Sequence, residues 1–219
     1  MIDKKTLAFL TSLKKNNNKP WFDAHKEQYL AAKDNVEGFI TELLKELSRF
    51  DPSLKDLKAK DCLFRIYRDV RFAKDKRPYK TNMGASISAG GKKSEGPGYY
   101  LHIEPGRAFL AGGMWMPEAD HLKKIRQEID YNSKDLQKVI SNKEFKKYYG
   151  GFDEEHKLKT TPKGYAKDHP QIELLKLTSF IVWHDYDNKQ ILSKNFVKEL
   201  AKGAKIMKPF LTFLETAIS

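Results

Sequence analysis

The residues of this chain best suited to chemistry are the basic side chains concentrated between Arg65 and Lys80. This segment contains two acids, Asp69 and Asp75, and seven cations: Arg65, Arg68, Arg71, Lys74, Lys76, Arg77 and Lys80. Four of the seven arginines of the chain lie here, whereas the basic residues elsewhere are almost all lysines. A guanidinium is a planar, permanently charged group that grips a carboxylate or a phosphate at two points, which an ammonium cannot do. The choice of arginine therefore indicates recognition of such oxygen-rich anions.

The alternation of residue types predicts how these side chains are oriented. We expect residues 62–72 to form a strand, in which Arg68 falls in the same row as apolar side chains and Arg65, Asp69 and Arg71 fall in the opposite row. A buried guanidinium without a partner is very costly. Arg68 must therefore meet a carboxylate or a bound anion.

Three interpretations of the segment remain open. In the first, it binds an anionic, phosphate-bearing ligand. In the second, it is a structural ion-pair network in an interaction protein, completed by acids outside the segment such as Glu104. In the third, it belongs to an enzyme acting on a phosphorylated or nucleic-acid substrate, with Asp69 or His102 as the acid–base group. Two acids cannot neutralise seven cations, so the first interpretation is favoured.

The anion site of the first interpretation is built from five basic residues with three supporting residues. The supporting residues are Asp69, Asp75 and Tyr79, and the ligand-binding residues are Arg65, Arg68, Arg71, Lys76 and Lys80.

Composition limits the partners and the compartment. The formal charge of +12 favours a polyanion, either an anionic small molecule or nucleic acid, although the lysines are spread over the whole chain. No apolar run is long enough to span a bilayer, so we expect no membrane partner. The start of the chain has no apolar segment of the kind that a secretory signal contains, and we expect a cytoplasmic location. The single cysteine, Cys62, excludes an internal disulfide and a thiolate zinc site.

The spacing of apolar residues changes along the chain, and it predicts the helices and strands that must position the motif. Helical spacing over 3–50 and again after 117 flanks a central region of alternating residues. There, 83–89 reads as a strand, and 99–104 and 107–114 read as a hairpin turning at Pro105-Gly106, across which Glu104 and Arg107 could pair. Another strand is predicted at 178–186. This order predicts an α+β fold, a single domain over residues 1–219 with a mainly antiparallel sheet and helices packed on it.

The motif resembles the signature of a bacterial family, with relatives in fungi and plants, that is catalogued as domain of unknown function 2461. The matching residues are Arg-x-x-Arg-Asp-x-Arg-Phe at 65–72, Asp-Lys with a following Tyr at 75–79, Asn-Asn-x-Lys-Pro-Trp-Phe at 16–22, the glycine-containing segments of the hairpin, and the Pro-Lys-Gly-Tyr and Asp-His-Pro segments within 162–170. The resemblance runs the full length of the chain. It implies no particular activity, cofactor or substrate, so the motif residues carry over only as the signature of the family.

Other chemical motifs are missing from the sequence. No two of the six histidines have metal-binding spacing, and there is no nucleophile elbow, Walker loop or dinucleotide fingerprint. We therefore assign no metal, no cofactor and no catalytic residue, and leave open whether the protein is an enzyme. Only His102 and His184 are positioned on strands where acid–base chemistry is worth testing.

Overall fold

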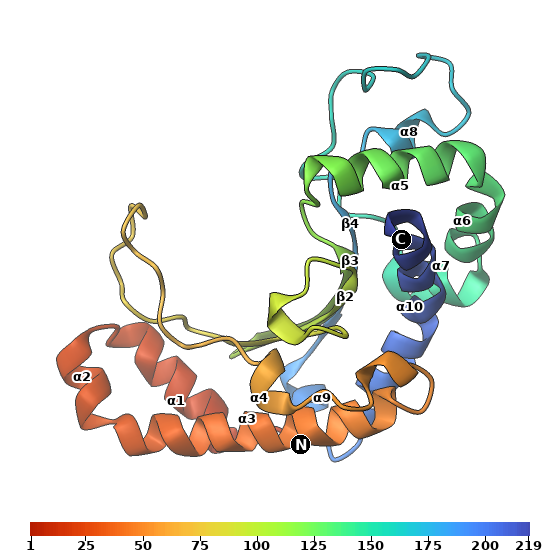
Figure 1. The fold of residues 1–219 in the computed structure, drawn as a ribbon. Helices are drawn as coiled ribbons and strands as arrows, with labels where there is room; N and C mark the ends of the chain where they lie inside the picture. The colour runs from red at the N-terminus through yellow and green to blue at the C-terminus, as the bar shows by residue number, and fades with distance from the viewer.

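The computed structural model describes all residues, 1–219, and its sheet and helices form the α+β fold that the sequence predicts (Figure 1). The strands are β1 (Met83–Ile87), β2 (Gly98–Glu104), β3 (Arg107–Met114) and β4 (Phe180–Tyr186). The α-helices are α1 (Lys4–Lys15), α2 (Lys19–Ala24), α3 (Lys26–Leu47), α4 (Ala59–Cys62), α5 (Ala119–Tyr131), α6 (Ser133–Ile140), α7 (Lys143–Tyr149), α8 (Ile172–Leu175), α9 (Asn188–Ile191) and α10 (Phe196–Ile218). Two short 3₁₀ helices lie in the connections: η1 (Pro52–Leu54) between α3 and α4, and η2 (Gly91–Lys93) between β1 and β2.

The four strands are antiparallel and lie in sequence order, β1-β2-β3-β4. The predicted hairpin of β2 and β3 is confirmed, with Glu104 opposite Arg107 and with Gly106 at a positive φ of 83° in the turn. The alternation that predicted β2 is also seen in its burial, because Tyr99, Leu101 and Ile103 are buried while the residues between them are half-exposed. One face of the sheet is thus core and the other is open.

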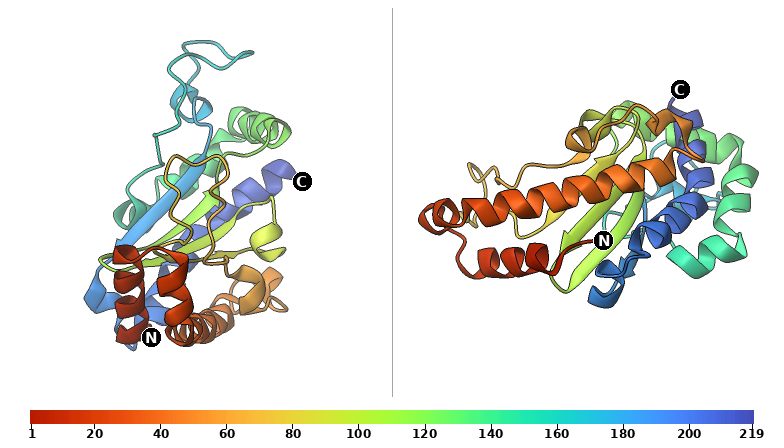
Figure 2. Two further views of the ribbon diagram at one scale, coloured as in Figure 1. Left: turned by 90° about the vertical axis from the view of Figure 1, so that its left-hand side faces the viewer. Right: turned by 90° about the horizontal axis from the view of Figure 1, so that it is seen from below.

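Helices α3 and α10 cover the core face. Seen from below, both cross the sheet on the same side (Figure 2), and their buried side chains join those of the strands in one hydrophobic cluster. The loop of residues 63–82 borders the open face on one side, and the region of α5 and α8 borders it on the other (Figure 1). None of the helices combines the length and the apolar character that crossing a bilayer requires.

The predicted strand at 62–72 is wrong. Helix α4 ends at Cys62, and residues 63–82 form an irregular hairpin, called here the motif hairpin, whose arms meet only at the bridge between Tyr67 and Tyr79 and through hydrogen bonds such as Arg68 N–H to the Pro78 carbonyl at 2.8 Å. The cause is local. Asp69 and Asp75 each accept a hydrogen bond from the backbone N–H two residues later, and these turns compete with a strand ladder.

Candidate functional site

The stem of the motif hairpin is closed by a carboxylate shared between two arginines. Arg68 Nη1 donates to Asp75 Oδ2 at 2.9 Å and also to the Arg77 carbonyl oxygen at 2.9 Å. Arg77 grips the same carboxylate with Nε at 3.0 Å and Nη2 at 2.8 Å. The hydrogen bonds from Arg77, and secondarily those from Arg68, hold the pKa of Asp75 far below its usual range. The expectation that Arg68 meets a carboxylate is confirmed, although its side chain is 27% exposed and does not lie in the core.

The tip of the hairpin is held by a second pair. Arg71 Nε and Nη2 contact the two oxygens of Asp69 at 3.0 and 2.7 Å, and this fork lowers the pKa of Asp69. Lys76 Nζ donates to the carbonyl oxygens of Val70 and Arg71 at 3.0 and 3.3 Å. Phe72 stands at the tip and is 95% exposed. Arg71 and Lys76 therefore donate their hydrogen bonds to acceptors within the hairpin itself.

The hairpin is anchored at its base by Tyr79. The backbone N–H and carbonyl of Tyr79 pair with the side chain of Asn17 at 3.0 and 2.9 Å, and the buried ring of Tyr79 stacks on Phe22 at 4.0 Å. Asn17 and Phe22 belong to the corner between α1 and α2, above which the hairpin rises (Figure 2). The family-like segment at 16–22 therefore serves as the support of the motif.

The ion pairs of the motif use Arg68, Arg71 and Arg77. Arg65, Lys76 and Lys80 have no carboxylate within ion-pair distance, but Lys76 donates to backbone carbonyls of the hairpin, whereas Arg65 and Lys80 do not. Lys80 Nζ lies 5.1 Å from the centre of the Phe64 ring. Burial lowers the pKa of Lys80, and the nearby positive charge of Arg65 lowers it further. Of the five candidate basic residues, Arg65 and Lys80 are therefore the two whose side chains make neither an ion pair nor a hydrogen bond.

Arg65 lines a cavity of about 520 Å³ beside the hairpin. This space, called here the basic cavity, is lined by one acid, Glu37, and by three further cations: Lys33 from α3, Lys60 from α4 and Lys92 from η2. Lys33 pairs loosely with Glu37 at 3.7 Å, and Lys92 donates to the Lys60 carbonyl oxygen at 2.9 Å. Spacing in the sequence did not reveal these lysines, because packing brings them together from three separate elements.

A hydrogen-bonded row of three side chains lies on the open face of β2. The Tyr100 hydroxyl and the Asn82 amide each lie 3.3 Å from His102 Nδ1, and His102 Nε2 lies 3.4 Å from a Glu104 oxygen. Since Glu104 accepts and the Asn82 amide donates, we assign the neutral tautomer with the proton on Nε2. Burial lowers the pKa of His102, against an opposing effect of Glu104, so the ring is neutral at pH 7.

Glu104 forms its hydrogen bonds with residues other than Arg107, the partner that the sequence predicted. Its carboxylate accepts hydrogen bonds from Lys14 and Thr81 at 3.3 Å each, so the predicted pairing with Arg107 across the turn is not formed. Burial raises the pKa of Glu104, but the hydrogen bonds from His102 and Lys14 outweigh it and the net pKa is lowered. Arg107 instead lies over the ring of Phe109 at 5.2 Å. The row on β2 therefore ends in an ionised carboxylate.

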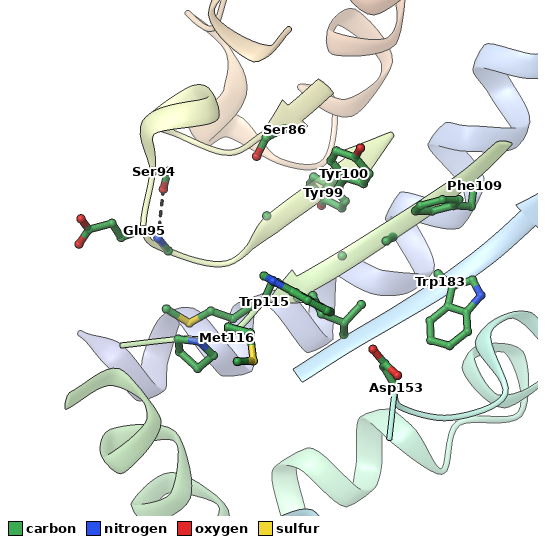
Figure 3. A pocket seen from close by; sticks show the side chains of 18 of the residues that line it. Ser86, Ser94, Glu95, Tyr99, Tyr100, Phe109, Trp115, Met116, Asp153 and Trp183 are labelled. Carbon is green, nitrogen blue, oxygen red and sulfur yellow. Dashed lines mark hydrogen bonds between the residues drawn. The ribbon is translucent and has the colours of Figure 1, made fainter. Parts of the chain in front are cut away.

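Further along the open face, aromatic side chains line a groove of about 710 Å³ (Figure 3). We call this the aromatic groove and define it by Tyr100, Phe109, Trp115 and Trp183. Tyr100, Phe109 and Trp183 point to the same face because their strands pair in register, with Ala111 opposite both Tyr100 and Trp183. The sequence analysis missed Trp115 and Trp183, and the alternation along 180–186 was the signal that could have placed Trp183.

The remaining reactive groups are not gathered into a site. No group of three or more His, Cys, Asp or Glu side chains is arranged to hold a metal ion. Cys62 is buried, and burial raises the pKa of its thiol to about 11, which makes it a poor nucleophile. His184 Nδ1 bonds the Tyr148 carbonyl oxygen at 2.8 Å beneath the sheet, away from the basic side chains of the hairpin.

These features define a class of protein: an α+β chain whose antiparallel sheet is covered on one face and open on the other, beside a self-paired arginine hairpin. The model of the family described as "Conserved hypothetical protein (DUF2461)" matches residues 5–213. The chain therefore belongs to this family, as the motif indicated. Neither a curated protein nor a solved structure matches the chain.

Proposed function

We propose that this protein binds a phosphate-bearing anion in the basic cavity, with Arg65 as the gripping residue and Lys80 beside it. The observation that carries the proposal is that Arg65, alone among the motif arginines, has no carboxylate partner and lines a cavity with three lysines. A free guanidinium can bind two phosphate oxygens at once, and the lysines add charge without fixing geometry.

The other residues of the expected site support this ligand indirectly. Arg68 and Arg71 are paired with Asp75 and Asp69, and Tyr79 fixes the base of the hairpin. They hold the segment that carries Arg65 and Lys80 in place. The bound anion is either a small phosphate compound or a phosphate of a nucleic acid, and we propose the cytoplasm as the compartment, which the single, buried thiol of Cys62 supports.

Ligand-induced stabilisation tests the proposal. Thermal unfolding is measured with phosphate, sulfate, nucleotides, sugar phosphates and short single- and double-stranded DNA, for the wild type, Arg65→Gln and the matched control Arg71→Gln. A ligand at a hundred times its dissociation constant adds about 2.7 kcal/mol to the stability of the folded state. We expect a shift of the midpoint in the wild type and in Arg71→Gln, and none in Arg65→Gln. Equal loss in both variants, or no shift with any ligand, would contradict the proposal.

A second candidate function is catalysis on a phosphorylated or nucleic-acid substrate. It is favoured by the row Tyr100–His102–Glu104, which lies next to the basic cavity through Asn82, a residue that lines the cavity and contacts His102. A neutral imidazole whose Nε2–H is held by a carboxylate offers Nδ1 as a proton acceptor. Burial also raises the pKa of Tyr100, which keeps its hydroxyl protonated and able to donate.

Turnover decides this second candidate. Release of phosphate from phosphomonoesters and cleavage of single-stranded oligonucleotides are assayed for the wild type, His102→Gln and Glu104→Gln. Catalysis through His102 predicts loss of activity in His102→Gln and, in Glu104→Gln, a lower rate with an altered pH profile. A wild type without turnover, or a His102→Gln variant as active as the wild type, leaves the protein as a binding module.

A further inference from the structure

We propose that the aromatic groove is a second binding site, distinct from the basic cavity, and that its ligand is an organic cation of the linear polyamine class. The groove lies on the open face of the sheet, and its lining includes residues of β2, β3 and β4 and the residues that follow β3. Its charge is opposite to that of the basic cavity and of the chain as a whole.

The first line of evidence is the charge of the lining. Four acids line the groove against one cation, Arg107, which gives −4 + 1 = −3 in a chain of net charge +12. The acids are Glu95, Glu118, Asp153 and Glu155. None of the ion pairs of the protein involves any of these four carboxylates, although the chain has 41 lysine and arginine residues to offer. A cationic ligand complements this lining and a polyanion does not.

The second line of evidence is the exposure of the aromatic rings. Trp115 is 58% exposed and Trp183 is 39% exposed, and Trp115 is supported edge-on by His156 at 5.0 Å. Tryptophan is the side chain that attracts cations most strongly through its ring face. The groove already contains one such contact, because the Arg107 guanidinium lies 5.2 Å from the centre of the Phe109 ring.

The third line of evidence is the backbone at the groove wall. Met116, next to Trp115, has a φ of 43°, the only positive φ outside glycine in the chain. Its N–H donates to Ser179 Oγ at 2.9 Å, which holds this conformation. Backbone strain of this kind is retained where surrounding contacts over-determine it, and it gathers at binding sites. Trp115, the preceding residue, and Met116 itself both line the groove.

The distribution of the acids selects the shape of the cation. Figure 3 shows Glu95 on the loop at one side of the groove and Asp153 beside β4, with Trp115 and Met116 between them. Asp153 is fixed by its N–H to the Ile181 carbonyl oxygen at 2.9 Å, and its Oδ1 accepts from the Glu155 N–H at 3.0 Å. A chain of methylene groups with ammonium groups at its ends places apolar carbon on the rings and charge at the acids. A volume of about 710 Å³ is also in the range of small-molecule sites.

Intrinsic fluorescence tests the proposal with spermidine as the probe. The chain has three tryptophans, and Trp21 stacks on His25 at 4.0 Å in α2, outside the groove. We expect spermidine to cause a saturable change of fluorescence that weakens as salt is added and that persists in Trp21→Phe, which keeps both groove tryptophans, Trp115 and Trp183. The single change Asp153→Asn keeps the oxygen that accepts from the Glu155 N–H and should weaken binding by about fivefold, the upper end of what one solvent-exposed ion pair contributes.

Two control variants distinguish a specific binding site from nonspecific electrostatic attraction of the polycation. Asp56→Asn removes an exposed acid that does not line the groove, and Arg65→Gln alters only the basic cavity, so both should bind spermidine as the wild type does. Equal weakening in Asp153→Asn and Asp56→Asn would overturn the proposal. Binding of a neutral oligosaccharide such as maltohexaose, or of a single-stranded oligonucleotide, to the groove in place of spermidine would overturn it as well. Because the probe and the residues differ from those of the anion test, either site can fail without the other.

Discussion

The Arg68 guanidinium donates to the Asp75 carboxylate at 2.9 Å, across the stem of the motif hairpin. This contact divides the signature into two parts. Arg68 belongs to the part that shapes the segment, together with the pairs of Arg71 and Arg77. Arg65, three residues before Arg68, has no such partner and faces a cavity. The motif therefore combines three arginines paired with carboxylates and one, Arg65, that has no carboxylate partner.

Replacing Arg68 with Ala should loosen the hairpin without unfolding the domain. Asp75 keeps Arg77 as a partner, and ion pairs as exposed as these stabilise a protein only weakly. We expect faster amide hydrogen exchange over 66–80 and a small decrease of the thermal midpoint. Leu110→Ala, which opens a space in the core below β3, is the comparison and should be much more destabilising. A midpoint for Arg68→Ala as low as that of Leu110→Ala would make Arg68 a core-stabilising residue instead.

The sequence predicted the sheet well and the motif hairpin poorly. Side-chain alternation predicts a strand only where no local hydrogen bonds compete with strand pairing. In β2, buried residues alternate with half-exposed ones, so side-chain alternation and backbone pairing agree. In β3 the alternation holds only as far as Leu110, and residues 110–114 are all buried. Between 63 and 82 the alternation is similar, but Asp69 and Asp75 take backbone N–H groups into local turns and Pro78 has none to give. Local side-chain bonds therefore overrode the strand pattern.

The candidate site was predictable only where its partners are near in sequence. The need of Arg68 for a carboxylate could be inferred, and Asp75 supplies it seven residues later. The basic cavity, in contrast, depends on how α3, α4 and η2 pack around Arg65, and no spacing encodes that arrangement. The same holds for Trp115, which lines a groove formed by several separate elements.

The affinity for phosphate should depend on the protonation of Lys80 at alkaline pH. Burial and the charge of Arg65 lower the pKa of Lys80 below its ordinary value of 10.5. The ammonium that attracts the anion is present below this lowered pKa and is lost as pH rises through it. Calorimetric titration with inorganic phosphate should therefore show affinity falling at a lower pH than for an ordinary lysine.

Lys80→Arg is the matched control for that titration, because an arginine stays charged throughout the range. Its affinity should stay flat over the interval in which the wild type weakens. Parallel curves for the two proteins would mean that Lys80 does not contact the anion.

Gly84→Ala should disturb the row on β2. A methyl group at Gly84 would lie 2.7 Å from the Tyr100 hydroxyl oxygen and 3.2 Å from two ring carbons, so the ring must move away. We expect a loss of about 1–2 kcal/mol from overpacking. The contact of Tyr100 with His102 Nδ1 should also break, which ¹⁵N shifts of the imidazole report.

The same substitution in a Tyr100→Phe background tests the cause, because this background lacks the hydroxyl oxygen, which is the atom nearest to the new methyl group. Gly84→Ala should then be less costly than in the wild type, and the difference between the two costs measures the clash with the hydroxyl. Equal costs in both backgrounds would place the strain elsewhere in β1.

Asp51→Asn should be among the most destabilising polar changes in the chain. Asp51 is 3% exposed; its Oδ2 accepts from the Tyr99 hydroxyl at 3.2 Å and forms an ion pair with Lys208 Nζ at 3.1 Å, and these contacts connect the segment after α3 to β2 and α10. Removing the charge leaves Lys208 with only its contact to Glu215 at 3.0 Å. Breaking one partner of a buried pair costs about 3 kcal/mol, measured as a lower midpoint of urea unfolding.

Two further variants show whether the loss comes from that pair. Asp56→Asn, an exposed acid in the same connection, should leave the midpoint unchanged. In Lys208→Met no ammonium remains to be left with fewer partners, so adding Asp51→Asn should cost clearly less there than in the wild type. If Asp51→Asn is equally costly in both backgrounds, the hydrogen bond with Tyr99, and not the charge of Lys208, accounts for the stability that Asp51 provides.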